Sequence, residues 1–255
     1  MSSFLSIQNL SKNFGGLRAV DSVSFDMKQN TIHSVIGPNG AGKTTLFNLI
    51  AGSIQSDSGS ISFLNTDITS LESYQIAHCG IFRTFQAVKL SDRMSVIENV
   101  MLGMHTKTSS GFLGGMMLSP KARSEEAYMR EESFKALADV GLEQYALEEA
   151  GSLPFGSQRM IELARALVAR PSLLLLDEPA SGLNMKETEE LTYKISVLKN
   201  RGLSILLVEH DMSLVMEISD TITVLNFGKK IAEGKPCDIQ KNEEVIRIYL
   251  GDDNA

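Results

Sequence analysis

Short runs of β-branched and aliphatic residues recur along the chain and predict β-strands. They lie at residues 22–27, 31–37, 172–177, 203–209 and 221–228, and the N-terminal segment reads as a further strand. The last three runs are continuously apolar rather than alternating. Strands of that kind are buried on both faces, so the pattern predicts a parallel sheet covered by helices.

Helical spacing of apolar residues separates these strands. It occurs at residues 42–52, 186–200 and 212–220. Strands and helices that alternate along a chain are typical of an α/β architecture with a parallel sheet. The pattern therefore predicts an α/β core.

The middle of the chain has a different pattern. Almost no strand signal occurs between residues 95 and 170, whereas Ser95 and Glu98 form a capping box that predicts a helix start. A charged amphipathic helix is expected over residues 121–141, ending at Gly141. We therefore predict a helical subdomain at about residues 88–168.

The remaining segments are assigned to the core or to irregular structure. The α/β core is expected to comprise residues 1–87 and 169–255. A Gly- and Ser-rich stretch at 105–120 predicts a loop, and residues 251–255 predict a frayed acidic end.

Composition narrows the class of protein. The chain has 255 residues, of which 43% are hydrophobic and 22% charged, as in ordinary globular proteins. Its net charge of −7 argues against a broad basic surface for nucleic acid. Two distant cysteines indicate neither a disulfide framework nor a zinc site, and favour a reducing, cytoplasmic setting.

No targeting or membrane-spanning segment is expected. The N-terminus lacks the charged start, apolar block and cleavage site of a secretory signal. A spanning helix needs roughly 20 mainly apolar residues, and the apolar stretch at 111–118 is far shorter. Any membrane role would depend on a partner.

A phosphate-binding loop follows one of the predicted strands. Residues 37–44 read GPNGAGKT, between the strand HSVI and the helix TTLFNLIAG. Glycines let backbone N–H groups approach phosphate oxygens, and the helix start favours negative charge. Lys43 is expected to reach the β- and γ-phosphates, and the Thr44 hydroxyl to bind Mg²⁺. The alternative is a Gly-rich turn that matches by chance. The predicted nucleotide-binding residues here are Gly37, Pro38, Asn39, Gly40, Ala41, Gly42, Lys43, Thr44 and Thr45.

Two acidic residues end a buried strand in the segment LLLLDEP. Asp177 is a candidate Mg²⁺ ligand, and Glu178 is the candidate general base that activates the attacking water. The alternative is an acidic pair that merely ends a strand. His210 also follows an apolar strand, where open α/β sheets place ligands. The histidines at 33, 78 and 105 are interpreted as structural or solvated.

A second helix start follows the segment LPFGSQ at residues 153–158. Free N–H groups at Gly156 and Ser157, together with the helix dipole, suit an anion. The same residues could simply cap the helix.

In this order and spacing, GPNGAGKT, RTFQ, LPFGSQ, LLLLDEPASGLN and LLVEHD resemble an ABC-type ATPase over essentially the whole chain. The resemblance implies a single domain over residues 1–255. It also implies an α/β fold with a RecA-like P-loop NTPase core, an N-terminal antiparallel β subdomain and an inserted helical subdomain. ATP and Mg²⁺ are the implied ligands.

The same resemblance implies roles for individual residues. Two subunits of the family sandwich ATP head to tail, so Gly156 and Ser157 would contact the γ-phosphate of ATP on the partner chain. Gln86 would sense Mg²⁺ and water and couple to the membrane subunit, His210 would contact the γ-phosphate, and Phe14 would stack on adenine. The alternative for Phe14 is a half-buried aromatic at a strand end.

The match to the usual signature Leu-Ser-Gly-Gly-Gln is incomplete. Leu153 and Gly156 persist, whereas Pro154, Phe155 and Ser157 replace Ser, Gly and Gln. Proline removes a hydroxyl and an N–H, so we expect the Gly156 N–H and the Ser157 hydroxyl to retain part of the contact. In SGLN, which matches the D-loop, Asn184 replaces the more usual Asp.

The finer resemblance is to ATP-binding subunits of bacterial branched-chain amino acid importers. It is carried by NFGGLRAV, GPNGAGKTTLFNLI, FRTFQ, VIENVMLG, the segment at 105–120, the Pro-Phe-Gly signature and VIRIYLG. It implies a second ATPase chain, integral membrane permeases and, indirectly, a periplasmic substrate-binding protein, with no nucleic acid partner. The chain would then lie peripherally at the cytoplasmic face of the inner membrane.

Three alternatives remain at this point. The chain could be a soluble ABC-type ATPase in DNA repair or translation, or a nucleotide-binding regulatory module without turnover. It could also serve another transporter, for urea, other amino acids or lipid export. The sequence identifies neither the transported molecule nor whether the dimer is homo- or heteromeric.

Overall fold

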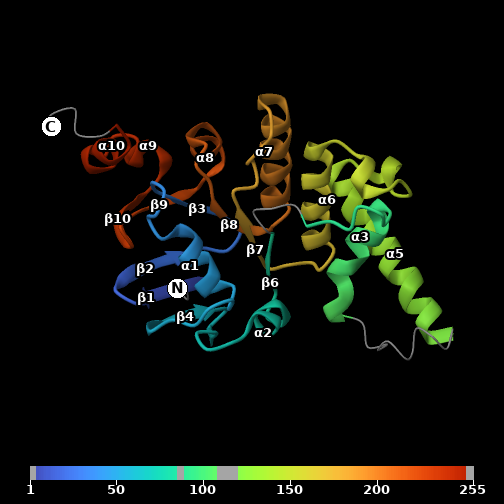
Figure 1. The fold of residues 1–255 in the computed structure, drawn as a ribbon, viewed down its shortest axis with the longest axis horizontal. Helices are drawn as coiled ribbons and strands as arrows, with labels where there is room; N and C mark the ends of the chain where they lie inside the picture. The colour runs from blue at the N-terminus through green and yellow to red at the C-terminus, as the bar shows by residue number, and fades with distance from the viewer. Residues whose placement is uncertain (1–3, 85–88, 108–119, 251–255) are drawn as a thin grey trace.

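The computed structural model describes residues 4–84, 89–107 and 120–250 of the chain, as two sheets and a group of helices (Figure 1). An antiparallel sheet has the strand order β2-β1-β4-β5. Its strands pair through neighbours close in the sequence, with Leu5 opposite both Met27 and Phe63. The strands are β1 (Leu5–Phe14), β2 (Leu17–Met27), β4 (Ser58–Phe63) and β5 (Thr66–Asp67).

The second sheet has six strands in the order β10-β9-β3-β8-β7-β6. Five of them are parallel, and β10 pairs antiparallel with β9 at the edge. The strands are β3 (Ile32–Ile36), β6 (Ile81–Arg83), β7 (Leu173–Asp177), β8 (Ser204–Val208), β9 (Thr221–Asn226) and β10 (Lys229–Gly234). The predicted mixed α/β fold is confirmed.

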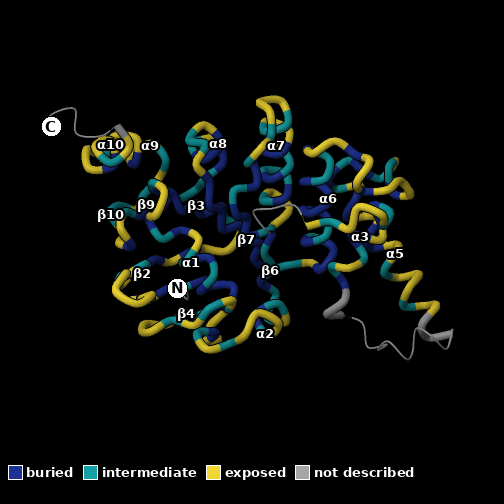
Figure 2. Tube along the Cα trace, viewed as in Figure 1, coloured by how far each residue is buried: buried dark blue, intermediate teal, exposed yellow. Residues whose placement is uncertain are grey.

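The central strands have apolar residues on both faces because each face packs in a different core. On β7, Leu173 and Leu175 join a cluster that includes the antiparallel sheet and α1 (Lys43–Ile50). Leu174 and Leu176 join the cluster on the opposite side, which includes α6 (Phe155–Leu167) and α7 (Met185–Asn200). Figure 2 shows these strands as the buried centre of the molecule. Continuous apolar runs therefore predicted the covered parallel sheet correctly.

Between β6 and β7 the described residues form helices and no strand. The Ser95–Glu98 capping box is present, and the long helix ends before Gly141, whose φ is 78°. The boundaries 88 and 168 stay a prediction. The helices are α3 (Val96–Met101), the 3₁₀ turn η1 (Leu102–Lys107), α5 (Pro120–Val140), η2 (Glu143–Tyr145), η3 (Ala150–Ser152) and α6 (Phe155–Leu167).

The other helices cover the sheets. They are α2 (Ser73–His78), α7 (Met185–Asn200), α8 (Met212–Ile218), α9 (Pro236–Ile239) and α10 (Glu243–Leu250). No helix within the described ranges is long and apolar enough to cross a membrane. Of the loop predicted at 105–120, residues 105–107 belong to η1 and Pro120 to α5, which corrects its ends. The rest of that loop and the tail at 251–255 lie outside the described residues.

Candidate nucleotide-binding site

The predicted functional segments follow strands that are neighbours in the parallel sheet. Val35 on β3, Val208 on β8 and Asp177 on β7 lie in one row across the sheet. The P-loop, Glu178 and His210 each begin within two residues of that row. Parallel strands place their carboxyl ends at one edge, where open α/β sheets bind ligands. The fold therefore brings together segments that are up to about 170 residues apart in the sequence.

The P-loop joins β3 to the start of α1 in a conformation that only glycine tolerates. Gly42 precedes the helix with a φ of 100°, and a Cβ there would lie 2.3 Å from the backbone oxygen of Ala19. At Gly37 a Cβ would lie 2.1 Å from the backbone oxygen of Leu225. These close approaches explain why the loop is rich in glycine.

Lys43 is buried at the start of α1, and its ammonium group points back into the loop. It donates hydrogen bonds to the backbone oxygens of Gly37 at 2.7 Å and Pro38 at 3.1 Å. Burial lowers the pKa of this ammonium, and the nearby carboxylates of Glu178 and Asp177 oppose that shift. A desolvated cation near two carboxylates suits a site that receives a highly charged ligand.

A cavity of about 340 Å³ opens over the P-loop. Phe14, which is 49% exposed at the end of β1, lines it together with Glu178. Phe227 also lines it and was not expected from the sequence. The remaining lining residues are Leu17, Arg18, Ala19, Asn39, Gly40, Ala41, Gly42, Lys43, Thr44 and Thr45.

Phe227 stands in the turn between β9 and β10. Its side chain is 82% exposed and its φ is 46°, a left-handed conformation that a bulky residue rarely adopts. An exposed aromatic ring in a strained turn beside a cavity indicates a role outside the core. In the sequence, Phe227 is a single aromatic residue near the end of the apolar segment TITVLNFG, and this pattern did not indicate a role at the site.

Asp177 is held by an arginine for which the sequence predicted no role. Arg83, at the end of β6, donates to the Asp177 carboxylate at 2.7 Å and to the Asn48 side chain of α1 at 2.6 Å. Asp177 is almost fully buried and Arg83 largely so. The guanidinium thus links β6, β7 and α1. Arg83 reaches Asp177 because β6 pairs with β7, which the sequence alone does not show. Its position in the motif RTFQ was the one sequence signal for a role at the site.

Glu178 is anchored through its backbone, whereas the side chain of His210 is largely exposed. Glu178 has a φ of 47°, and its N–H donates to the Val208 backbone oxygen at 2.8 Å. The side chain of His210 is 63% exposed, with Nδ1 3.6 Å from the carboxylate of Glu209. Glu209 is fully buried and was not predicted as a functional residue.

The Glu209 carboxylate joins two of the loops at the sheet edge. It accepts hydrogen bonds from the backbone N–H groups of Ala180 at 2.8 Å, His210 at 2.9 Å and Asp211 at 3.4 Å. Ala180 belongs to the loop after Glu178. Glu209 therefore ties the Glu178 loop to the His210 loop.

The signature segment lies apart from this cavity. Figure 1 shows α6 beyond α7, on the side of the helical group. The helix begins after Pro154 without a side-chain cap, Gly156 is buried against the Glu187 side chain, and neither Gly156 nor Ser157 lines the P-loop cavity. Gln86 lies outside the described residues. The signature segment and the P-loop cavity are therefore separate within one chain.

Asn184 performs a local task at the start of α7. Its side chain accepts the Glu187 N–H at 3.1 Å, while the Glu187 carboxylate accepts the Asn184 N–H at 2.9 Å. Asparagine and aspartate cap helices about equally well. The replacement of the more usual Asp therefore preserves this helix start.

Comparison with known proteins identifies the family. The family model described as ABC transporter matches residues 20–181, which is more than half of the chain. The chain belongs to the ABC transporter family. A second model, described as branched-chain amino acid ATP-binding cassette transporter, matches residues 229–255 of this ABC cassette.

Individual relatives span nearly the whole cassette. It is 43% identical to the high-affinity branched-chain amino acid transport ATP-binding protein LivG of Salmonella typhimurium, over 97% of this chain and 98% of LivG. It is 42% identical to BraF of Pseudomonas aeruginosa, which has the same description, with the same coverage.

Solved structures agree with the fold. The ADP conformation of MJ1267, an ATP-binding cassette of an ABC transporter, matches with a TM-score of 0.86 and 31% identity, over 98% of this chain and all of that one. The expected ABC-type fold is confirmed, and the cassette is an ATP-binding, ATP-hydrolysing protein of this family.

Proposed function

We propose that this ABC cassette is the ATP-hydrolysing subunit of an importer for branched-chain or related amino acids. The observation that carries the proposal is the sheet edge at which the P-loop, Glu178 and His210 meet. The high identity to LivG and BraF over nearly full length supports the substrate class.

ATP would occupy the cavity over the P-loop. Lys43 would exchange its bonds to Gly37 and Pro38 for phosphate oxygens, and Phe14 would stack on adenine. Glu178 would orient and deprotonate the attacking water, with His210 near the γ-phosphate.

Among the described residues, the Thr44 hydroxyl and the Asp177 carboxylate are oxygen donors near this edge that suit Mg²⁺. The ion would be held by the Thr44 hydroxyl, the Asp177 carboxylate and Gln86, and would supply neutralisation of phosphate charge. Arg83 fixes the Asp177 carboxylate in place. Removing its guanidinium would free that carboxylate to reorient.

A complete site needs a second ATPase chain, of the same or a different sequence. Gly156 and Ser157 would serve ATP on that partner chain, because they do not line the P-loop cavity of their own. The uncapped start of α6 offers N–H groups to a phosphate. ATP binding would then close the dimer and hydrolysis would reopen it.

The remaining partners would be integral membrane permeases and, indirectly, a periplasmic substrate-binding protein. A cavity of about 230 Å³ between α2 and β6 would be the docking surface for a permease. Arg83 lines this cavity and also binds Asp177, so a permease seated there would be linked to the nucleotide site. The cassette would lie at the cytoplasmic face of the inner membrane as a peripheral subunit.

The test begins with Glu178→Gln, which we expect to bind ATP without turnover and so accumulate as a dimer with the partner ATPase. Size-exclusion chromatography with and without ATP, after copurification from native membranes, measures this. Glu190→Gln, an exposed residue on α7, is the matched control and should hydrolyse ATP normally. Full hydrolysis by Glu178→Gln, or copurification without permeases, would contradict the proposal.

A further inference from the structure

Lys89 lies between β6 and α3, and two side chains of α6 bind the polar groups of its backbone. Its N–H donates to the Glu162 carboxylate at 3.0 Å, and its backbone oxygen accepts the Arg165 guanidinium at 2.6 Å. Lys89 belongs to no helix or strand, so these backbone groups need partners from outside its own segment. The chain at Lys89 is therefore fixed to the signature helix.

The Glu162 carboxylate is buried between two arginines of the same helix, with only 2% of its side chain exposed. Arg159 donates to one carboxylate oxygen at 3.1 Å, and Arg165 donates to the other at 3.3 Å. Ion pairs on an exposed helix face contribute little. A buried carboxylate, in contrast, is costly to separate from its partners. The three side chains therefore hold one another in a fixed arrangement.

Arg159 extends this arrangement to the start of the signature helix. Its guanidinium lies 5.5 Å from the centre of the Phe155 ring. That ring packs against the SGLN segment, where a Cβ on Gly182 would lie 3.0 Å from it. Phe155 replaces a glycine of the usual signature, so this contact comes from a departure from the usual pattern. Glu162 is thereby connected to the residue beside Gly156.

The same group adjoins the edge of the parallel sheet. Arg159 and Glu162 line a cavity of only about 10 Å³ together with Thr84 and Pro179. A void of that size is at the lower limit for one water molecule. Pro179 directly follows Glu178, the candidate general base. The buried carboxylate is therefore packed closely beside the loop that has this base.

We propose that Glu162 is a positioning residue, which fixes the segment at Lys89 to the signature helix so that the start of α6 meets ATP on the partner chain in one orientation. This inference rests on the proposed function. Glu162 touches no nucleotide in this account, and acts by removing freedom that dimer closure would otherwise have to restrict. Lys89 is three positions after Gln86, the predicted coupling residue, so movement of that segment would reach α6.

The first test is Glu162→Gln, which removes the charge and keeps the size of the side chain. In a Glu178→Gln background, Mg·ATP is titrated and the dimer with the copurified partner ATPase is measured by size-exclusion chromatography. Because glutamine keeps one acceptor of a charge-assisted set, we expect the ATP concentration for half-maximal dimer to rise about three- to tenfold. The Kd of the separate chain for Mg·ATP should stay within about twofold of its parent, since α6 does not line the P-loop cavity.

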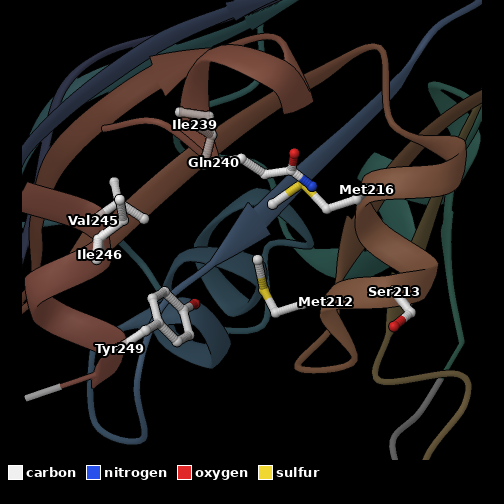
Figure 3. Close-up of a pocket in the computed structure, with 8 residues that line it drawn as sticks. All are labelled: Met212, Ser213, Met216, Ile239, Gln240, Val245, Ile246 and Tyr249. Carbon is white, nitrogen blue, oxygen red and sulfur yellow. The ribbon is translucent and has the colours of Figure 1, made fainter. Parts of the chain in front are cut away.

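Two controls separate positioning from loss of stability. Glu131→Gln removes the same charge from an exposed pair with Lys135 on α5, and should change neither value. Val245→Ala shortens a buried side chain beside the cavity of about 420 Å³ between α8 and α10 (Figure 3). Figure 1 shows α10 and α6 on opposite sides of the parallel sheet. This variant should lower Tm without raising the ATP concentration for dimer formation.

Arg165→Lys tests the same attachment if Glu162→Gln does not fold. Lysine keeps the charge but lacks the second nitrogen that lets arginine bond to Glu162 and Lys89 together, so the ATP concentration should again rise. An unchanged concentration, an equal rise in Val245→Ala, or a higher Kd of the separate chain would overturn the proposal. In each of these cases the proposed function stands if Glu178→Gln alone associates on addition of ATP. If it does not associate, both are refuted.

Discussion

Replacing the fully buried Glu209 with alanine should destabilise the protein. The side chain is fully buried, and its carboxylate accepts three backbone N–H groups from two loops. Alanine leaves these donors without their acceptor. Both the loop after Glu178 and the loop with His210 lose their common attachment.

The magnitude follows from the two short bonds. A hydrogen bond to a charged group contributes about 1.5–3 kcal/mol, so the bonds at 2.8 and 2.9 Å amount to about 3–6 kcal/mol, while the third, at 3.4 Å, adds little. Relief from burying a charge offsets part of this. We therefore expect a loss of about 3 kcal/mol. At 2–4 °C per kcal/mol for a chain of this size, Tm should fall by roughly 6–12 °C.

Urea unfolding monitored by circular dichroism gives the free energy directly, and Glu209→Gln should fall between wild type and alanine. Glu233→Ala is the control, since its pair with Lys230 is at the surface and should contribute less than about 1 kcal/mol. A loss in Glu209→Ala no larger than in this control would refute the reasoning. ATP turnover should also fall, because both loops at the sheet edge are released.

Two further predictions concern Phe227 and His33. Phe227→Gly should keep or raise stability by up to about 1 kcal/mol, because glycine relieves the φ of 46°, while ATP affinity falls; calorimetry measures both, and an unchanged affinity would remove the ring from the site. Burial, with a smaller effect of Lys230, lowers the pKa of His33 from 6.5 to about 4. Between pH 6.5 and about 4, the unfolded chain then binds up to one more proton than the folded chain. The free energy of unfolding therefore decreases as the pH falls, by about 1 kcal/mol between pH 7.5 and 5.5 and by about 3 kcal/mol at pH 4. Urea unfolding of wild type and His33→Gln tests this, and equal slopes in the two would contradict it.

The sequence predicted the parts of the fold that depend on local pattern. Leu173–Asp177 and Ser204–Val208 are strands buried on both faces, as their continuous apolar runs indicated. The capping box at Ser95 and the helix end at Gly141 were also correct. Each of these signals is complete within a few residues.

Elements with weaker local signals were not predicted. The strands Ser58–Phe63 and Lys229–Gly234 are edge or subdomain strands with polar, largely exposed residues, and so lack an apolar run. No helix was predicted at Glu243–Leu250, where VIRIYLG contributed only to the family resemblance. Such elements form because a neighbouring strand or core covers one face, which the segment itself does not show.

Contacts at the site depend on strand order. The glycines and Lys43 of the P-loop were predicted from their own motif. The bonds of Arg83 to Asp177 and of Glu209 to Ala180 join residues 94 and 29 positions apart. No spacing rule yields them until β6 and β8 are known to flank β7. The assigned roles of the site residues stay predictions for the experiments above.

The place of β3 in the sheet bears on how the protein is made. This strand is synthesised about 170 residues before its two neighbours, β8 and β9, which are formed by residues 204–208 and 221–226. The P-loop, which follows β3, also packs closely against the backbone of Leu225 and Gly228. Contacts at such separation form late. A growing chain therefore cannot complete its P-loop until β9, which ends at Asn226, has left the ribosome. Truncated products should accordingly lack the ability to compete with the finished subunit for ATP.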